Sequence, residues 1–399
     1  MLKYNLNKLI CFLFFSSLII IEFDLPRIGD FRTSYIPILV TIPILLLIMR
    51  KDILFNKNII LSPVFYTYAI FLIYSIISST WSINQFSGLI HASILLLLLI
   101  LSVQMSYFNY NTILRVVFII SSILIIFSWL FFAAFPELST RYIGFWRLKA
   151  FFFHEFELGF LTCINLIICF DKIINDKKIK NSIFNIYYIM FFISLITLLA
   201  TQTRTLLIYT SFIFFIMLLM APGTIKKHLL LILTAIFTLI VLSQLDLIIE
   251  IFSRGSGDAT LSGRLLTWER SLFVVQYFDR YIIGLGFDSF VSPTFDNFIQ
   301  GRGGSYRASH AHNSFVMAYF ETGLIGLSLL CFFIICTFNK IYLISKISKE
   351  YNIVLYIFLL SFLGSFTSLI YAGKAGLLLF LPVCLYFSVI NQNQSKITH

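Results

Sequence analysis

Two histidines stand in a polar stretch directly before a long apolar segment, in the sequence SHAHNSFVMAYFETGLIG, which contains His310 and His312. The imidazole pKa lies near neutrality, so His312 can take a proton from a hydroxyl group at working pH. Equally, Asn313 or Ser314 can cap a helix and leave His312 as a surface residue at the helix start. His310 is the weaker candidate, because it can simply orient its neighbour. The pair indicates acid–base or binding chemistry at a helix end, with capping as the structural alternative.

Arg204 interrupts the almost continuous apolar sequence LLATQTRTLLI. An arginine at the end of a membrane span can snorkel to the lipid headgroups, but ionisable residues at this depth usually face a cavity or a partner. Since a guanidinium binds phosphate through two parallel hydrogen bonds, we predict that Arg204 binds a phosphate group. Arg264 opens the stretch GRLLTWERSLFVVQYF and is a second candidate. Its alternative is a solvated charge at a helix end, with Glu269 as a salt-bridge partner.

Arg147 and Lys149 form a second basic group, just before the next apolar segment, and we predict that both bind substrate. Acidic residues within a span need partners. A contact between His154 and Glu155, or between Arg147 and Glu157, would therefore be as compatible with a structural role as with catalysis.

Lys374 lies in the glycine turn YAGKAG and is a further candidate for phosphate binding. The sequence has no phosphate-binding glycine loop of the ATPase type and no paired-aspartate metal motif in its longest polar segment, so we expect no ATP, cofactor or metal. A reaction without ATP must draw on energy stored in the substrate. Arginines at a membrane surface therefore suggest a lipid-linked pyrophosphate.

The chain that positions these residues is 59% hydrophobic and 12% charged, too little polar surface to cover a soluble domain. Since a helix needs about 20 apolar residues to cross a bilayer, we predict an all-α polytopic membrane protein with about twelve transmembrane helices. The expected spans are 9–23, 34–49, 60–79, 88–106, 113–135, 150–170, 183–201, 205–221, 229–249, 313–337, 353–371 and 376–391. The net charge of +11 comes largely from lysines in short loops, where they set membrane orientation, so no nucleic-acid partner is expected.

With this count of spans, the lysine-rich loops and both termini fall on one side, which the positive-inside rule makes cytoplasmic. The chain then divides into spans one to nine (1–249), a large outer loop with short helices (250–312), and three further spans with a cytoplasmic tail (313–399). All the candidate residues emerge on the outer face. One apolar stripe in the loop is expected to pack onto the membrane domain or to lie in the membrane interface. It consists of Leu265, Trp268, Leu272 and Val275.

These motifs resemble those of the bacterial O-antigen ligases and the related O-antigen and exopolysaccharide polymerases. The family pattern of His-Asn, nine residues and Gly-x-x-Gly is matched from His312 to Gly326. TQTR resembles the arginine motif of the ligases, and SGRLLTWERS with IIGLGFDSF resembles the family's outer loop, with Arg264 in the arginine position. The resemblance covers about residues 190–330, and no motif could be matched in the first five spans.

The resemblance implies a metal-independent, inverting glycosyltransferase of the bacterial inner membrane, embedded among its lipids and active on the periplasmic face. It would transfer a glycan from undecaprenyl pyrophosphate to an acceptor hydroxyl. Arg204 and Arg264 would hold the pyrophosphate, and His312 would act on the hydroxyl. His310, Asn313 and the remaining basic candidates would contribute to substrate binding. Gly323 and Gly326 would let neighbouring helices approach closely.

The acceptor stays open. A ligase would use the lipid A–core in lipopolysaccharide biosynthesis, whereas a polymerase would use a second lipid-linked repeat unit. The TQTR motif favours the ligase, with the polymerase as a close alternative. A polysaccharide or lipid transporter is more distant, because no internal symmetry relates the two halves of the sequence.

Overall fold

The computed structural model describes residues 10–16, 18, 57–142, 146–152, 154–175, 185–220, 261–290, 295, 311–368, 370 and 377–397. Most of these residues are helical. A short antiparallel hairpin pairs β1 (Thr140–Tyr142) with β2 (Trp146–Leu148) and follows the single helical turn α8 (Pro136–Ser139). The sequence predicted the helices but not this hairpin, because strands of three residues carry almost no periodic signal.

Four helical segments of the described chain are long and apolar enough to cross a membrane: Pro63–Trp81, Gln85–Met105, Tyr110–Ala134 and Ser314–Ile347. The first contains α5 (Pro63–Ser78), and the others are α6, α7 and α16. Shorter or less apolar helices complete the set: α9 (Glu155–Asn175), α10 (Ile186–Thr201), α11 (Arg204–Met220), α17 (Asn352–Gly364) and α18 (Leu377–Ile397). Every predicted span between 60 and 221 and between 313 and 391 thus coincides with a described helix, although α9 begins at 155 rather than 150.

The predicted spans 34–49 and 229–249, and most of 9–23, lie outside the described residues. The prediction of about twelve transmembrane helices, and the division of the chain at 249 and 312, therefore stay predictions. The apolar helices nevertheless establish the broad class, a helical integral membrane protein.

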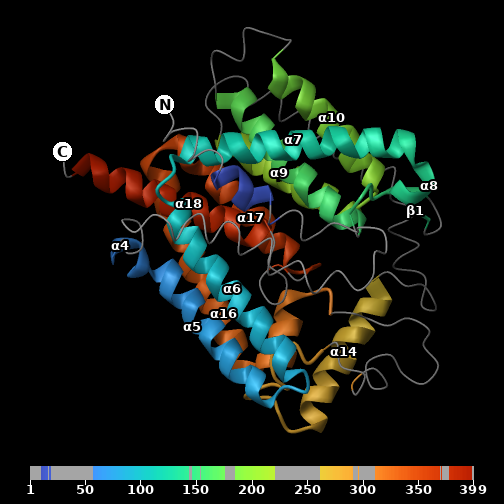
Figure 1. Cartoon of the computed structure of the whole chain (residues 1–399), viewed down its shortest axis with the longest axis vertical. Coiled ribbons are helices and arrows are strands. Elements are labelled where there is room, and N and C mark those ends of the chain that lie inside the picture. Colours follow the sequence, from blue (N-terminus) through green and yellow to red (C-terminus); the bar gives the residue numbers. More distant parts are fainter. Residues whose placement is uncertain are drawn as a thin grey trace.

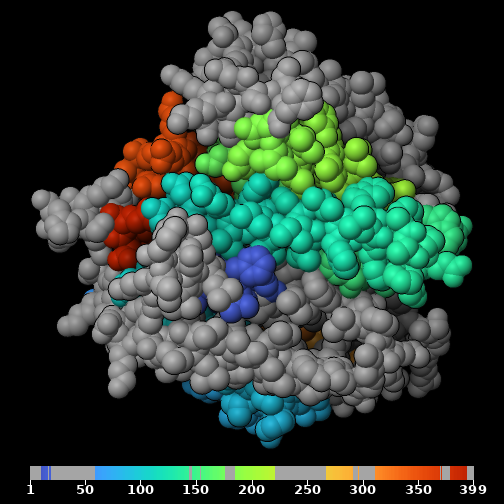
Figure 2. Space-filling view, turned by 45° about the horizontal axis from the view of Figure 1, so that its top comes forward, coloured from blue at the N-terminus to red at the C-terminus, as the bar shows by residue number. Residues whose placement is uncertain are grey.

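The helices form two groups that meet at α17 and α18 (Figure 1). In the first group α16 packs along α5, with the rings of Tyr68 and Phe333 only 4.4 Å apart between centroids. The second group contains α7, α9, α10 and α11. In Figure 2, α7 crosses one face of the molecule as a continuous band beside α10.

Asn165 joins three helices of the second group in their fully buried interior. Its side-chain nitrogen donates to the hydroxyls of Ser121 and Ser122 on α7, at 2.7 and 3.0 Å. Its oxygen accepts from Ser194 of α10 at 3.1 Å. Because polar groups in a bilayer need internal partners, this network fixes α9 between the two helices that carry the hairpin and the TQTR turn.

The long helix α16 is interrupted at Gly323, whose φ of 66° and ψ of −163° are not helical. The segment 281–286 fills the break and takes over the backbone hydrogen bonds that the helix gives up. Four hydrogen bonds do this: from Leu285 to Phe320 (3.0 Å), from Gly286 to Glu321 (2.8 Å), from Leu324 to Tyr281 (2.9 Å) and from Ile325 to Ile282 (3.2 Å). The break therefore leaves no backbone group unpaired at these positions, as an apolar environment requires.

The two glycines of the Gly-x-x-Gly motif serve this break. A β-carbon at Gly323 would overlap the carbonyl of Ile282, and one at Gly326 would overlap the side chain of Thr322 on the same helix. The prediction that the pair brings neighbouring helices together is thus wrong in its partner. The close approach is made by a connecting segment and by a side chain of α16 itself.

Candidate functional site

The hairpin places two arginines directly opposite each other, since Arg141 pairs with Arg147 in the register of β1 and β2. Like charges in this position repel each other. The carboxylate of Glu155, only 5% exposed, lies between them, at 2.9 Å from Arg147 Nη1 and 3.8 Å from Arg141 Nη1. The start of α9 therefore neutralises the hairpin and holds it against the helix bundle.

His154 completes this arrangement. Its Nδ1 lies 2.9 Å from Arg141 Nη1, and its backbone amide donates to Glu157 Oε2 at 3.0 Å. The second contact is half of a capping box at the start of α9. The structure therefore corrects the pairs expected from the sequence: Arg147 binds Glu155 rather than Glu157, and the His154 ring contacts Arg141 rather than Glu155.

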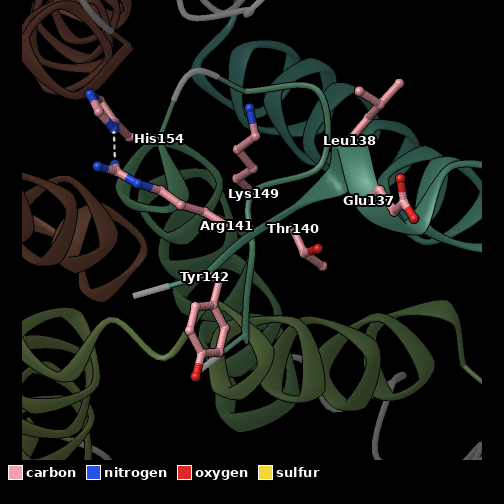
Figure 3. A pocket seen from close by; sticks show the side chains of 7 residues that line it. All are labelled: Glu137, Leu138, Thr140, Arg141, Tyr142, Lys149 and His154. Atoms are coloured by element: carbon pink, nitrogen blue, oxygen red, sulfur yellow. Dashed lines mark hydrogen bonds between the residues drawn. The ribbon is translucent and has the colours of Figure 1, made fainter. Parts of the chain in front are cut away.

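An open cavity of about 540 Å³ lies beside the hairpin (Figure 3). The walls are formed by Glu137, Leu138, Thr140, Arg141, Tyr142, Lys149 and His154. Because a guanidinium cannot accept a hydrogen bond, the His154 Nδ1 must accept from Arg141, which places the proton of the neutral ring on Nε2. In Figure 3 the Lys149 side chain lies between this pair and Glu137. Arg141, Lys149 and His154 thus offer hydrogen-bond donors to one cavity.

The TQTR turn connects α10 to α11. The helix α10 ends at Thr201, Gln202 adopts a left-handed conformation with φ of 51°, and Arg204 begins α11. The hydroxyls of Thr201 and Thr203 lie 2.8 Å apart and close the turn. The Arg204 side chain is exposed, and its charge lies near enough to Arg147 for the two to repel each other. The structure thus brings Arg204 and the basic hairpin together.

The His-Asn motif forms the start of α16. The indole of Trp268 donates to the carbonyl of Ala311 at 2.7 Å, His312 turns the chain with φ of 51°, and Asn313 is the N-cap. The Asn313 side-chain oxygen accepts from the second and third amides of α16, at 2.9 and 3.2 Å. The capping alternative considered for Asn313 is therefore present in the structure. The His312 side chain is partly exposed beside this cap.

The starts of α9, α11 and α16 and the end of α17 meet at one end of the bundle. Three contacts connect them: Gly159 with Thr203, Phe160 with Gly364, and the amide of Ser314 with the carbonyl of Ser365 at 2.8 Å. Arg204, the basic hairpin and His312 are consequently gathered on the same side, although they are more than 100 residues apart in the sequence.

The remaining predicted residues are described in part or not at all. Arg264 lies in α14 (Leu261–Tyr277), one turn before Trp268, and only its backbone is described. Since Trp268 contacts the residue before His312, α14 carries Arg264 toward the His-Asn motif. His310 and Lys374 lie outside the described residues.

The buried face of α14 differs from the predicted stripe. Val274 and Val275 are fully buried, whereas Leu272 is 46% exposed, so the buried face is shifted around the helix. The helix packs against α16, which supports the expectation that this segment folds back onto the helix bundle.

Two residues near this end were not singled out from the sequence. Arg141 was passed over, although the alternation of basic and aromatic residues around a glycine in TRYIGFWRLK is a hairpin signal. Glu321 was missed as well; it is 1% exposed and lies beside Asp288. A buried carboxylate next to a Gly-x-x-Gly motif would have been its only signal.

Comparison with known proteins agrees with this arrangement. Residues 189–331 match the family described as O-antigen ligase, a range that contains TQTR, α14 and the His-Asn motif. The resemblance predicted from the motifs is thus confirmed over these residues. No curated protein matches the chain significantly. The family match supports a glycosyltransferase activity of the O-antigen ligase and polymerase type, on lipid-linked glycans, in an integral membrane protein.

Proposed function

We propose that this protein transfers a glycan from undecaprenyl pyrophosphate to an acceptor hydroxyl, in the inner membrane and on its periplasmic face, without a metal ion. The observation that carries the proposal is the meeting of the starts of α11 and α16 at one end of the bundle. This arrangement gathers a phosphate-binding arginine, Arg204, and a possible base, His312, at a single surface. Both termini would lie on the opposite, cytoplasmic side.

In the proposed reaction the acceptor oxygen attacks the anomeric carbon of the donor, and a new glycosidic bond forms with inversion. The bond between that carbon and the pyrophosphate oxygen breaks, and undecaprenyl pyrophosphate leaves with the electron pair. Arg204 and Arg264 stabilise the negative charge of the leaving group. His312 takes the proton of the acceptor hydroxyl. His310, Lys149 and Lys374 bind further parts of the substrates.

The backbone supports a special role for His312. Among the described residues, five that are not glycine have positive φ values, and three of these adjoin candidate site residues: Ala150, Gln202 and His312. Such conformations cost free energy and concentrate at functional sites. Asn313 contributes the cap that fixes the direction of the chain directly after His312.

A ligase and a polymerase would share this machinery and differ in the acceptor. The TQTR turn favours the ligase, with the lipid A–core as the acceptor, and the polymerase is the second candidate. A transporter is the least supported function, because the candidate residues gather at one end of the bundle rather than along a path across it.

The test replaces His312 and, separately, Arg204 with alanine in the native host. Surface glycan is then resolved by length and by attachment to the lipid A–core, with Arg115→Ala as the control at the other end of α7. Accumulation of full-length lipid-linked polymer without attachment would identify a ligase. A core that carries single repeat units would identify a polymerase. An unchanged glycan ladder in both variants at normal expression would overturn the catalytic assignment.

A further inference from the structure

The cavity beside the hairpin has the chemistry of an anion site. Arginine and lysine donate hydrogen bonds but cannot accept them, and the neutral His154 ring presents its Nε2–H because Nδ1 is engaged by Arg141. The neighbouring carboxylate of Glu155 is buried and lies against Arg147, so it does not compete from within the cavity. Glu137 is the acidic residue of the lining and stands across from Lys149 (Figure 3).

An aromatic surface adjoins this cavity. Tyr142 lines it, and Trp146 lies opposite Tyr142 in the hairpin register, with ring centroids 5.2 Å apart. Both side chains are more than half exposed, at 62% and 61%. Exposed aromatic faces stack on the C–H faces of sugar rings, and their polar edges remain wet. A membrane-interface anchor would use the same residue types, and the experiment below separates the two uses.

We propose that this cavity binds an acidic sugar of the transferred glycan, with its carboxylate or phosphate on Arg141, Lys149 and His154 and its ring on Tyr142 and Trp146. The proposal rests on the proposed function, because it takes the glycan as the substrate. Its location supports this ligand: β2 contacts α10, and Arg147 lies near Arg204. A glycan whose pyrophosphate is held at Arg204 would extend over the hairpin, so the cavity would select for acidic repeat units.

The experiment measures binding to the purified full-length protein in nanodiscs of uncharged lipid. The probes are trigalacturonate, its neutral counterpart trigalactose, and inorganic phosphate. Trigalacturonate should bind at least about tenfold more tightly than trigalactose, since one charge-assisted hydrogen bond is worth roughly a factor of ten. Equal affinities for the acidic and neutral trisaccharides would overturn the proposal.

Variants locate the site. Arg141→Ala and Lys149→Ala should each weaken trigalacturonate binding about tenfold, whereas Arg115→Ala, an exposed arginine near the other end of α7, should not change it. Lys149→Ala protects the test against a folding defect, because Arg141 lies beside the buried Glu155 and its loss can destabilise the hairpin. Unchanged binding in Lys149→Ala, with Arg141→Ala also unchanged or unfolded, would place the anion elsewhere.

Further arms identify the ligand class. Trp146→Ala should weaken binding of the trisaccharide but not of phosphate. If it instead lowers only the affinity of the protein for vesicles, the aromatic pair is a membrane anchor and the sugar site is wrong. Binding that disappears when phosphatidylglycerol is added to the nanodiscs would identify a lipid headgroup as the ligand, which also contradicts the proposal.

Failure of this site and failure of the proposed function are distinguishable. His312→Ala should abolish glycan transfer and leave trigalacturonate binding unchanged. If His312→Ala retains transfer while Lys149→Ala loses binding, the sugar site stands and the catalytic assignment falls. If His312→Ala loses transfer and the acidic trisaccharide shows no preference, the sugar site falls alone.

Discussion

The amide nitrogens of Gly284 and Gly323 each occupy the space in which the other residue would carry a β-carbon, at 2.5 Å from its ideal position. Both residues also have positive φ values, 73° and 66°. The segment after α14 and the break in α16 can therefore come together only because both positions are glycine.

We expect Gly323→Ala and Gly284→Ala to destabilise the protein. The left-handed conformation alone costs an alanine about 1–2 kcal/mol, and the overlap with the facing backbone adds to this. The measurement is thermal unfolding of the detergent-purified protein, with Ser328→Ala, an exposed position on α16 beyond the break, as the control. Unfolding temperatures equal to that of the wild type in both glycine variants would contradict this account of the break.

Glu321 holds the same segment from its other side. Its carboxylate is 1% exposed and accepts hydrogen bonds from the backbone of Asp288 and Phe290, while the negative charge of Asp288 lies close by. Glu321→Gln keeps an accepting oxygen and removes the buried charge, so its stability should equal or exceed that of the wild type. Glu321→Ala leaves the two amides without their acceptor and should lower the free energy of unfolding by about 1–3 kcal/mol.

Comparison of these two variants by thermal unfolding decides the role of Glu321. A loss of stability in both would show that the charge itself is needed. A stable Glu321→Gln variant without transfer activity would give the carboxylate a role in the reaction rather than in holding the segment.

The sequence predicted the positions of helices well because length and apolar composition determine which segments can cross a bilayer. The hairpin, the break at Gly323 and the Asn165 network depend on contacts between distant segments, and single-sequence periodicity contains no such information. For the candidate site, the residue types of Arg204 and His312 were sufficient to single them out. The partners of Arg147 and His154 were not predictable, since three carboxylates stand within a few positions of each other in PELSTRYIGFWRLKAFFFHEFE.

The pair of Arg147 and Glu155 tests whether a predicted binding residue is structural. Removal of one partner leaves the other charge buried, so Arg147→Ala should lower the free energy of unfolding by about 3–5 kcal/mol. The double variant Arg147→Ala/Glu155→Ala should recover part of this loss, because no unpaired charge remains.

The readouts are unfolding temperature and glycan transfer in the single and double variants. If the double variant regains both stability and transfer, Arg147 has only a structural role. If it regains stability but not transfer, Arg147 binds substrate, as the sequence predicted. Equal stability of Arg147→Ala and the wild type would show that the 2.9 Å ion pair contributes nothing to the fold.

Asn313 can be tested in the same way, because its cap and its proposed contact with substrate need different atoms. The cap uses the side-chain oxygen, which aspartate and serine also provide, whereas a substrate contact through the amide nitrogen needs asparagine. Asn313→Asp should therefore keep the stability of the wild type, and Asn313→Ala should lose about 1 kcal/mol. The measurements are thermal unfolding and glycan transfer, with Asn111→Ala, an exposed asparagine on α7, as the control. Full transfer in Asn313→Asp would limit Asn313 to orienting the chain after His312, while a stable variant without transfer would assign the amide to the substrate.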